Sequence, residues 1–254
     1  MTEQKAERIN KYLAQAGICS RRQADVLVEQ GKVLVNGQKA ESGMKVHPED
    51  KVELVGGKEQ KAKKEIKGSA QKLVLAFYKP VGVTCTEKDK FADKKVLDYV
   101  KTRTRVTYAG RLDKESEGLM LLTNDGDLIQ RMMKGSEVHE KEYVVKVNRE
   151  LTEEFIRDMG KGVYLEELKR ATKPCQVTME GKYTFRIVLT QGMNRQIRRM
   201  CETFGYKVTA LKRVRIMSVE LGKMKSGESR VLTPQECRKL YQAVGMQVPG
   251  EFLK

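Results

Sequence analysis

The sequence predicts an α+β protein in which a small N-terminal domain is linked to a larger domain with a mixed or antiparallel sheet flanked by helices. Three observations support this class. The 254 residues exceed what one small domain needs. A lysine-rich, glycine-flanked segment at 56–72 is too polar to fold alone. Helical and strand periods interleave without βαβ regularity. We therefore expect domains at 1–55 and 73–254, with a flexible linker at 56–72.

The first domain is predicted to hold two helices followed by a hairpin. Apolar residues have helical spacing over 9–16, and Gly17 follows as a stop signal. Ser20 opens a Ser-Arg-Arg-Gln capping box, which places the start of the second helix. Asn36-Gly37 lies between two short strand-forming segments and predicts a two-residue hairpin turn. A further short strand is expected at 52–55.

The second domain is predicted to mix strands and helices along its whole length. Alternating or continuous apolar residues bounded by turn signals predict strands at 73–78, 119–123, 143–147 and 183–189. Apolar residues at helical spacing predict helices at 127–133, at 151–159, and after Asn194 as far as Phe204. We expect Asn194 to be the N-cap of the last of these helices.

The composition indicates a polyanionic partner and argues against several classes of site. Lys and Arg total 50 against 34 Asp and Glu, a formal charge of +16, which favours binding to nucleic acid. There is no apolar stretch long enough for a membrane span and no secretory signal, so we expect a cytoplasmic protein away from membranes. Five scattered cysteines and two histidines fit neither a disulfide framework nor a metal site.

The N-terminal helices carry features of an anion-binding site. Arg21 and Arg22 lie in the first turn of the second helix, where the helix dipole disfavours cations unless an anion such as phosphate is bound. An equally good interpretation of these two residues alone is that both arginines are simply exposed to solvent, at a small cost in stability. The wider pattern of Arg8 to Ala14, Gly17, Ser20 to Ala24 and Val35-Asn36-Gly37 resembles the S4 RNA-binding domain. That resemblance implies RNA contacts by Arg8, Lys11, Ser20, Arg21, Arg22 and Asn36.

The segment 108–126 contains a carboxylate in a setting that suits catalysis. Two glycines bracket a compact polar loop, Gly110-Arg111-Leu112-Asp113, that leads into an apolar strand. An aspartate on such a loop is partly desolvated yet reachable, and a nearby arginine would keep it ionised, as a nucleophile or base requires. For an isolated Arg-Leu-Asp, a structural pair between Arg111 and Asp113 is the competing interpretation.

This segment closely resembles the catalytic motif of pseudouridine synthases of the RsuA and RluA type, here with the N-terminal S4 domain of the RsuA/RluB/RluE/RluF group. Three further motifs follow the family in order: 78–83, 141–145 and 192–200. The resemblance implies that Asp113 is the catalytic carboxylate, that Tyr143 is the active-site tyrosine, and that Arg198 pairs with Asp113. It also implies substrate contacts by Arg111, Leu211, Lys79, Asn194, Arg195 and Arg199.

The implied reaction is the isomerisation of a uridine in large-subunit (23S) ribosomal RNA, with no cofactor and no metal. Asp113 would either attack C1′ or remove the C2′ proton to give a glycal, and the sequence does not choose between them. The target uridine, and a transfer RNA as a second substrate, are left open. We expect a monomer. The basic stretch 195–215, with Glu202 as its single acid, predicts a track for RNA phosphates.

Two other functions fit the basic charge. The chain would then be a non-enzymatic RNA- or ribosome-binding protein of the S4 type, or a carboxylate-dependent glycosidase acting on nucleic acid. A glycosidase releases free base, whereas isomerisation leaves the mass of the RNA unchanged. The four motifs in family order favour the synthase.

Overall fold

A computed structural model describes residues 6–56, 62–66, 70–86, 93–134 and 139–253. The chain divides into two compact units, which are treated separately below. The first contains residues 1–73 with the short segments 102–106 and 124–126, and the second contains the remainder. Within the described residues, no helix combines the length and apolar character needed to cross a membrane.

The first unit holds a helix pair and a small sheet. Its helices are α1 (Ile9–Gln15) and α2 (Arg21–Glu29). Its strands pair in the order β3-β2-β5-β6, with bounds Gln38–Lys39, Val33–Val35, Val52–Gly56 and Ala62–Glu65. A separate pair joins β1 (Glu7–Arg8) to β4 (Lys45–Val46). Buried apolar side chains, among them Leu13 and Val28, fill the space between the helices and the sheet.

Local signals in this unit act as the sequence predicts. Ser20 accepts a hydrogen bond from the Gln23 amide, and the Gln23 side chain accepts one from the Ser20 amide, which completes the capping box. Asn36 and Gly37 both have positive φ, at 51° and 82°, as the tight turn between β2 and β3 requires. Both helices and the hairpin are therefore confirmed.

The expected flexible linker at 56–72 is partly wrong. Its residues 57–61 and 67–69 lie outside the described residues. Between them, β6 pairs antiparallel with β5, and Ile66 is buried in the core of the first unit. Backbone hydrogen bonding along β5 and burial of one apolar side chain hold this segment in place, despite its polar composition. The sheet of the first unit therefore continues to residue 66.

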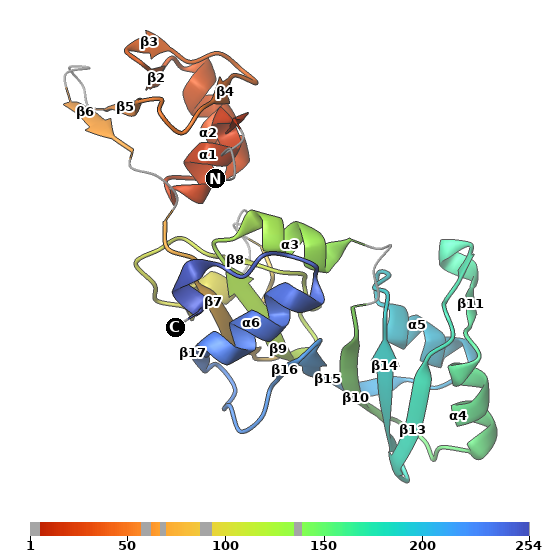
Figure 1. Ribbon diagram of the computed structural model, residues 1–254. Coiled ribbons are helices and arrows are strands. Elements are labelled where there is room, and N and C mark those ends of the chain that lie inside the picture. The colour runs from red at the N-terminus through yellow and green to blue at the C-terminus, as the bar shows by residue number, and fades with distance from the viewer. Residues whose placement is uncertain (1–5, 57–61, 67–69, 87–92, 135–138, 254) are drawn as a thin grey trace. The chain divides into compact units, whose positions relative to one another are not determined.

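The second unit is built on one large sheet with helices against it (Figure 1). In the described residues, its main strand order is β13-β14-β10-β15-β9-β7-β17. These strands are Gln176–Gly181, Thr184–Leu189, Lys141–Val147, Val208–Ile216, Glu117–Thr123, Val74–Lys79 and Ser229–Val231. Short strands β8 (Thr107–Tyr108) and β16 (Val219–Glu220) pair with β9 and β15. The pair β9–β15 is parallel, and the other described pairs are antiparallel, so the expected mixed sheet is observed.

Two hydrophobic cores lie along this sheet. The first joins β7 and β9 to α3 (Gly126–Met133) and α6 (Pro234–Ala243). The second joins β10 and β14 to α4 (Glu153–Gly160) and α5 (Gln196–Thr203). A small hairpin of β11 (Tyr164–Leu165) and β12 (Arg170–Ala171) follows α4. Short 3-10 turns occupy Val96–Asp98, Glu166–Leu168 and Gly250–Phe252.

The two halves of the sheet meet where β9 and β15 run in parallel, in the register Lys212↔Glu117 and Arg213↔Gly118. Gly118 is required there, since a Cβ built on it would stand 2.3 Å from the Arg213 carbonyl oxygen. This junction holds the start of β9, directly after the Asp113 loop, against the middle of β15.

Candidate active site

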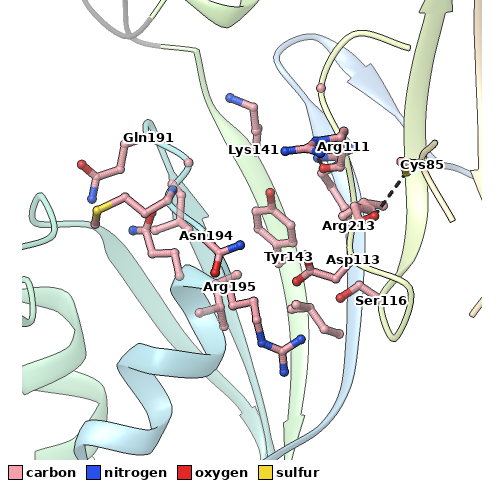
Figure 2. A pocket seen from close by; sticks show the side chains of 18 of the residues that line it. Cys85, Arg111, Asp113, Ser116, Lys141, Tyr143, Gln191, Asn194, Arg195 and Arg213 are labelled. Carbon is pink, nitrogen blue, oxygen red and sulfur yellow. Dashed lines mark hydrogen bonds between the residues drawn. The ribbon is translucent and has the colours of Figure 1, made fainter. Parts of the chain in front are cut away.

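A cavity of about 720 Å³ opens in the second unit where the two halves of the sheet meet (Figure 2). Its walls come from the 110–116 loop before β9, from the start of β10, from the β14–α5 connection and from β15. Of the described residues that line it, Asp113 is the sole carboxylate. Nine are basic: Arg111, Lys114, Lys134, Lys141, Arg170, Lys173, Arg195, Arg198 and Arg213. The cavity therefore suits a ligand with negative charge.

Asp113 sits on the loop between β8 and β9. Gly110 begins this loop with φ of +85°, and the buried Leu112 side chain anchors it. The Ser116 amide donates to the Asp113 carbonyl oxygen at 3.0 Å, which closes a tight turn around 113–116. The half-buried Asp113 carboxylate makes no hydrogen bond and no ion pair with any residue that the structure describes, and it borders the cavity. It is thus held in place by its backbone, with its oxygens available to a substrate.

Tyr143 and Leu211 border the same cavity from neighbouring strands. Tyr143 lies on β10 directly opposite Arg213 of β15, and Leu211 lies two residues earlier on β15. The Tyr143 side chain is half-buried and packs against the second core, so its ring is fixed on one side. Figure 2 shows Tyr143 and Asp113 near each other. The structure therefore brings together the predicted catalytic aspartate, the predicted tyrosine and the predicted apolar residue.

Arg198 lies beside the Asp113 loop, but not in the predicted ion pair with Asp113. Its guanidinium donates to the Glu115 carbonyl oxygen at 3.3 Å, to Ser116 Oγ at 3.4 Å and to the Val208 carbonyl oxygen at 3.3 Å. It also lies 3.8 Å from the Glu115 carboxylate. The expected pair is therefore absent among the described contacts: both terminal nitrogens donate to other groups, and the buried Nε has no hydrogen-bond partner among the described residues. Arg198 fastens the loop that carries Asp113.

Lys79, expected to contact substrate, is instead fully buried behind the loop. Its ammonium group donates to the carbonyl oxygens of Pro80 at 2.8 Å and Ser116 at 2.7 Å, and more weakly to that of Lys114 at 3.5 Å. It does not line the cavity. Burial lowers the pKa of Lys79 to about 8, and nearby Cys85 and Asp113 oppose that shift. This lysine joins the end of β7 to the end of the Asp113 loop.

Replacement of Lys79 by methionine is expected to lower the free energy of unfolding by about 3 kcal/mol, because backbone carbonyls lose a charged donor inside the protein. We also expect a loss of activity, since the Asp113 loop would be less constrained. Chemical denaturation compared with Lys161→Met, a lysine whose side chain is 65% exposed, measures the first effect. Equal stability of the two variants would contradict the role assigned to Lys79.

The difference in stability between wild type and Lys79→Met should depend on pH. The pKa of Lys79 falls from 10.5 to about 8 on folding, so between these values the unfolded chain binds more protons than the folded one. The Lys79 contribution to stability is therefore smallest below pH 8 and rises with pH through this interval. The stability gap between wild type and Lys79→Met should widen by up to about 1.4 kcal/mol per pH unit there. A constant or narrowing gap would contradict the burial of a charged amine.

The predicted residues of the 192–200 motif separate into two groups. Asn194 and Arg195 line the cavity, and Arg195 pairs with Glu115 at 3.1 Å. Arg199 does not line it. Its guanidinium donates to the Asn194 carbonyl oxygen at 3.1 Å and forms an ion pair with Glu167, so its donors are used within the fold. The expected Asn194 N-cap is also wrong, because Arg195 is the N-cap of α5, with φ of 51°.

Several cavity residues were not predicted to be site residues. Arg213 and Lys141 face the cavity from β15 and β10, and Arg170 and Lys173 lie on the β12 side. Burial, and then the neighbouring Arg213, lower the pKa of Lys141. The signal for Arg213 was the two-residue period of β15, which places it on the same face as Leu211. The sequence instead predicted this basic stretch to be a track for RNA phosphates.

In the first unit, the predicted RNA-binding residues differ in exposure. Arg8, Arg21 and Arg22 are exposed, and Lys11 is half-buried. Ser20 and Asn36 use their side chains within the fold. Ser20 caps α2, whereas Asn36 donates to Asp50 at 2.8 Å and accepts from the Lys51 amide at 2.9 Å. The three exposed arginines are thus better placed than Ser20 and Asn36 to meet a phosphate chain.

Comparisons with known proteins match both parts of the chain. Residues 73–203 match the family model for RNA pseudouridylate synthase, and residues 7–52 match the S4 domain. The chain is 46% identical to the dual-specificity RNA pseudouridine synthase RluF of Escherichia coli O6:H1, over 93% of this chain and 79% of that protein. It is 37% identical to the ribosomal large subunit pseudouridine synthase B of Bacillus subtilis, over 92% and 95% of the two chains. A crystal structure of a pseudouridylate synthase matches with a TM-score of 0.66 and 27% identity, over 92% of this chain and 99% of that one.

Proposed function

Because this chain belongs to the RNA pseudouridylate synthase family, we propose that it converts a specific uridine of large-subunit (23S) ribosomal RNA into pseudouridine, with Asp113 as the catalytic carboxylate. The observation that carries the proposal is the Asp113 carboxylate, which is unpartnered among the described residues and borders a cavity otherwise lined by basic and neutral side chains. The names of the two relatives support RNA, and ribosomal RNA in one case, as the substrate. This substrate implies a cytoplasmic protein.

The chemistry requires one bond to break and one to form at the same sugar carbon. The N1–C1′ bond of uridine breaks, the uracil turns, and C5 bonds to C1′. Asp113 assists either by attacking C1′ or by removing the C2′ proton, and its tight backbone turn holds the carboxylate ready for either step. The product is an isomer of the substrate, so no co-substrate is consumed.

A uridine within folded RNA reaches Asp113 only after it leaves its stack, which costs a few kcal/mol. The Tyr143 ring, held by the second core, offers a face on which the extruded base can stack. Its hydroxyl group is proposed to accept or relay the C5 proton. Leu211 supplies an apolar contact from the neighbouring strand. Arg111, Asn194 and Arg195, which line the opening of the cavity, are proposed to contact the RNA chain.

Each described residue that lines the cavity belongs to the second unit. The active form is proposed to be a monomer. The first unit, with exposed Arg8, Arg21 and Arg22, is proposed to bind RNA through its phosphates. The proposal favours an enzyme over a purely RNA-binding protein, because RNA binding alone gives no use to a carboxylate that is unpartnered among the described residues in a basic cavity.

Mapping of pseudouridine in living cells tests this function. Ribosomal RNA and transfer RNA from a strain that lacks the gene, with and without the restored gene, are treated with carbodiimide and read by primer extension. We expect stops in large-subunit ribosomal RNA that depend on the restored gene, with the transfer RNA fraction showing whether a second substrate exists. Identical stops in both strains would contradict the proposal.

Replacement of both Arg21 and Arg22 by alanine is expected to weaken RNA binding by about tenfold at moderate salt. The number of counterions released on binding, taken from the slope of log affinity against log salt, should fall by about two. The Ser20–Gln23 capping box is retained, so α2 should remain folded. Binding titrations at several salt concentrations measure both effects. Unchanged affinity at every salt concentration would exclude this surface from RNA binding.

A further inference from the structure

Arg213 is a buried cation with an unused donor. Its side chain is 3% exposed. Nε donates to the Leu119 carbonyl oxygen at 2.7 Å, and one terminal nitrogen, Nη1, reaches the Arg111 carbonyl oxygen at 3.5 Å. The other terminal nitrogen, Nη2, is buried and has no hydrogen-bond partner among the described residues. Among the described residues, no carboxylate lies within ion-pair distance of this guanidinium.

A buried Nη2 donor without an acceptor is energetically unfavourable within the protein alone. A buried donor without an acceptor is destabilising, and more so when the group is charged. Buried polar groups in folded proteins almost always have a partner, so an exception needs an explanation. Arg213 lines the cavity with Asp113 and lies directly across from Tyr143 in the sheet register. Figure 2 labels both residues among those that line the cavity. The missing acceptor is therefore expected to arrive with the substrate.

An RNA nucleotide offers two kinds of acceptor, phosphate oxygens and base carbonyls. Phosphates belong to a chain that runs over the surface, and the exposed guanidinium group of Arg111 is available to them where it lines the cavity. Arg213 is recessed, and backbone carbonyls fix two of its nitrogens. A flat base extruded into the cavity can reach it, whereas a phosphodiester linked on both sides cannot. The acceptor is thus a carbonyl oxygen of the base.

We propose that Arg213 is a further catalytic residue, which donates through Nη2 to a carbonyl oxygen of the extruded uracil and stabilises the negative charge that the base acquires during the reaction. This inference rests on the proposed function. When the N1–C1′ bond breaks, its electron pair remains on the uracil ring and spreads over N1, O2 and O4. C5 then bonds to C1′ and loses its proton, and N1 gains one. A fixed cation beside O2 or O4 lowers the energy of the charged base in either mechanism open to Asp113.

Sulfur substitution in the RNA tests this contact, because sulfur accepts hydrogen bonds poorly. Target RNAs carry tritium at C5 of the reacting residue, which is uridine, 2-thiouridine or 4-thiouridine. Single-turnover release of tritium is measured for wild type, Arg213→Met and Arg213→Lys. The control is Arg215→Met, an arginine on the same strand whose guanidinium already pairs with Glu140 and Glu142. For each protein the rate with the thio-substituted RNA is divided by the rate with uridine RNA.

We expect Arg213→Met to release tritium from uridine RNA about 10²-fold more slowly than wild type, the usual effect of removing one donor to a developing charge. In wild type, sulfur at the contacted position weakens the hydrogen bond from Arg213 and slows the reaction. In Arg213→Met this hydrogen bond is already absent, so the rate ratio at that position should differ from the wild-type ratio by about tenfold or more. Arg215→Met should keep the wild-type ratios. A purely structural role for Arg213 would slow all three RNAs equally and leave both ratios unchanged.

The remaining outcomes are also decisive. If Arg213→Met does not fold, as judged by its thermal transition, Arg213→Lys gives the same test, since lysine keeps the charge but cannot reproduce a planar guanidinium with two nitrogens fixed by backbone carbonyls. Ratios equal to wild type at both sulfur positions in an active variant would overturn the assignment and leave the proposed function standing. Absence of tritium release from uridine RNA by the wild-type protein would overturn the proposed function and this assignment together.

Discussion

Replacement of Asp113 by asparagine is expected to lower the rate of pseudouridine formation by about 10⁴-fold or more, the usual scale for loss of a group that acts directly on the reacting atoms. Asparagine has nearly the same shape, but it cannot attack C1′ or accept the C2′ proton. The Asp113 side chain makes no hydrogen bond with the described residues, and its turn is closed by backbone groups alone. The variant should therefore fold normally and keep its RNA affinity.

Single-turnover kinetics with a ribosomal RNA fragment, together with binding titrations, check this result. Asp158→Asn is the matched control, because that aspartate lies on α4, pairs with Lys161 at 2.8 Å and does not line the cavity. The control should retain activity within about twofold, as expected for a surface substitution. Near wild-type activity of Asp113→Asn would remove the carboxylate from the reaction, and a loss confined to RNA affinity would make it a binding residue.

The second large effect is structural. Gly118→Ala is expected to destabilise the protein by about 3–5 kcal/mol, because backbone strain from the positive φ and steric overlap of the new Cβ both act at this position. The new Cβ would lie 2.3 Å from the Arg213 carbonyl oxygen and 2.6 Å from its amide nitrogen, at a residue whose φ is +114°. The Arg213 backbone cannot move away from the new Cβ without separating β9 from β15. Those strands carry the Asp113 loop and Arg213, so activity should be lost with stability.

Gly181→Ala is the matched control for this prediction. Gly181 has open space around its Cα and no positive φ, so alanine there should be neutral or stabilise the protein by up to about 1 kcal/mol. Denaturant unfolding of both variants gives the comparison. If Gly118→Ala retained wild-type stability, β9 and β15 would not pack as closely as the structure has them.

Local signals in the sequence were sufficient for much of the fold. The Ser20 capping box, the Asn36-Gly37 turn and the alternation in β10 and β14 depend on neighbouring residues only, and each forms as predicted. The α5 cap shows the limit of such reasoning. Asn194 is the better capping residue, but Arg195 takes that place in a left-handed conformation and pairs with Glu115 from a distant loop.

Contacts between distant segments account for what the sequence did not predict. The parallel pairing of β9 with β15 joins residues more than ninety positions apart, such as Gly118 and Arg213, and no local pattern encodes it. Lys79 was expected to contact the substrate, but tertiary packing buries it against three backbone carbonyls. Arg198 likewise reaches the backbone of the Asp113 loop rather than the carboxylate. In both cases the side chain holds the loop that carries Asp113 in place of the contact expected from the sequence.

Tritium release provides the most direct test of the central claim, that this cavity isomerises uridine without hydrolysing it. Large-subunit ribosomal RNA labelled with tritium at C5 of uridine is incubated with the purified protein. Tritium in solvent, pseudouridine in the RNA and free uracil are then measured together. The account predicts equal amounts of released tritium and new pseudouridine, with no free uracil. Free uracil in place of pseudouridine, or RNA binding without any tritium release, would contradict it.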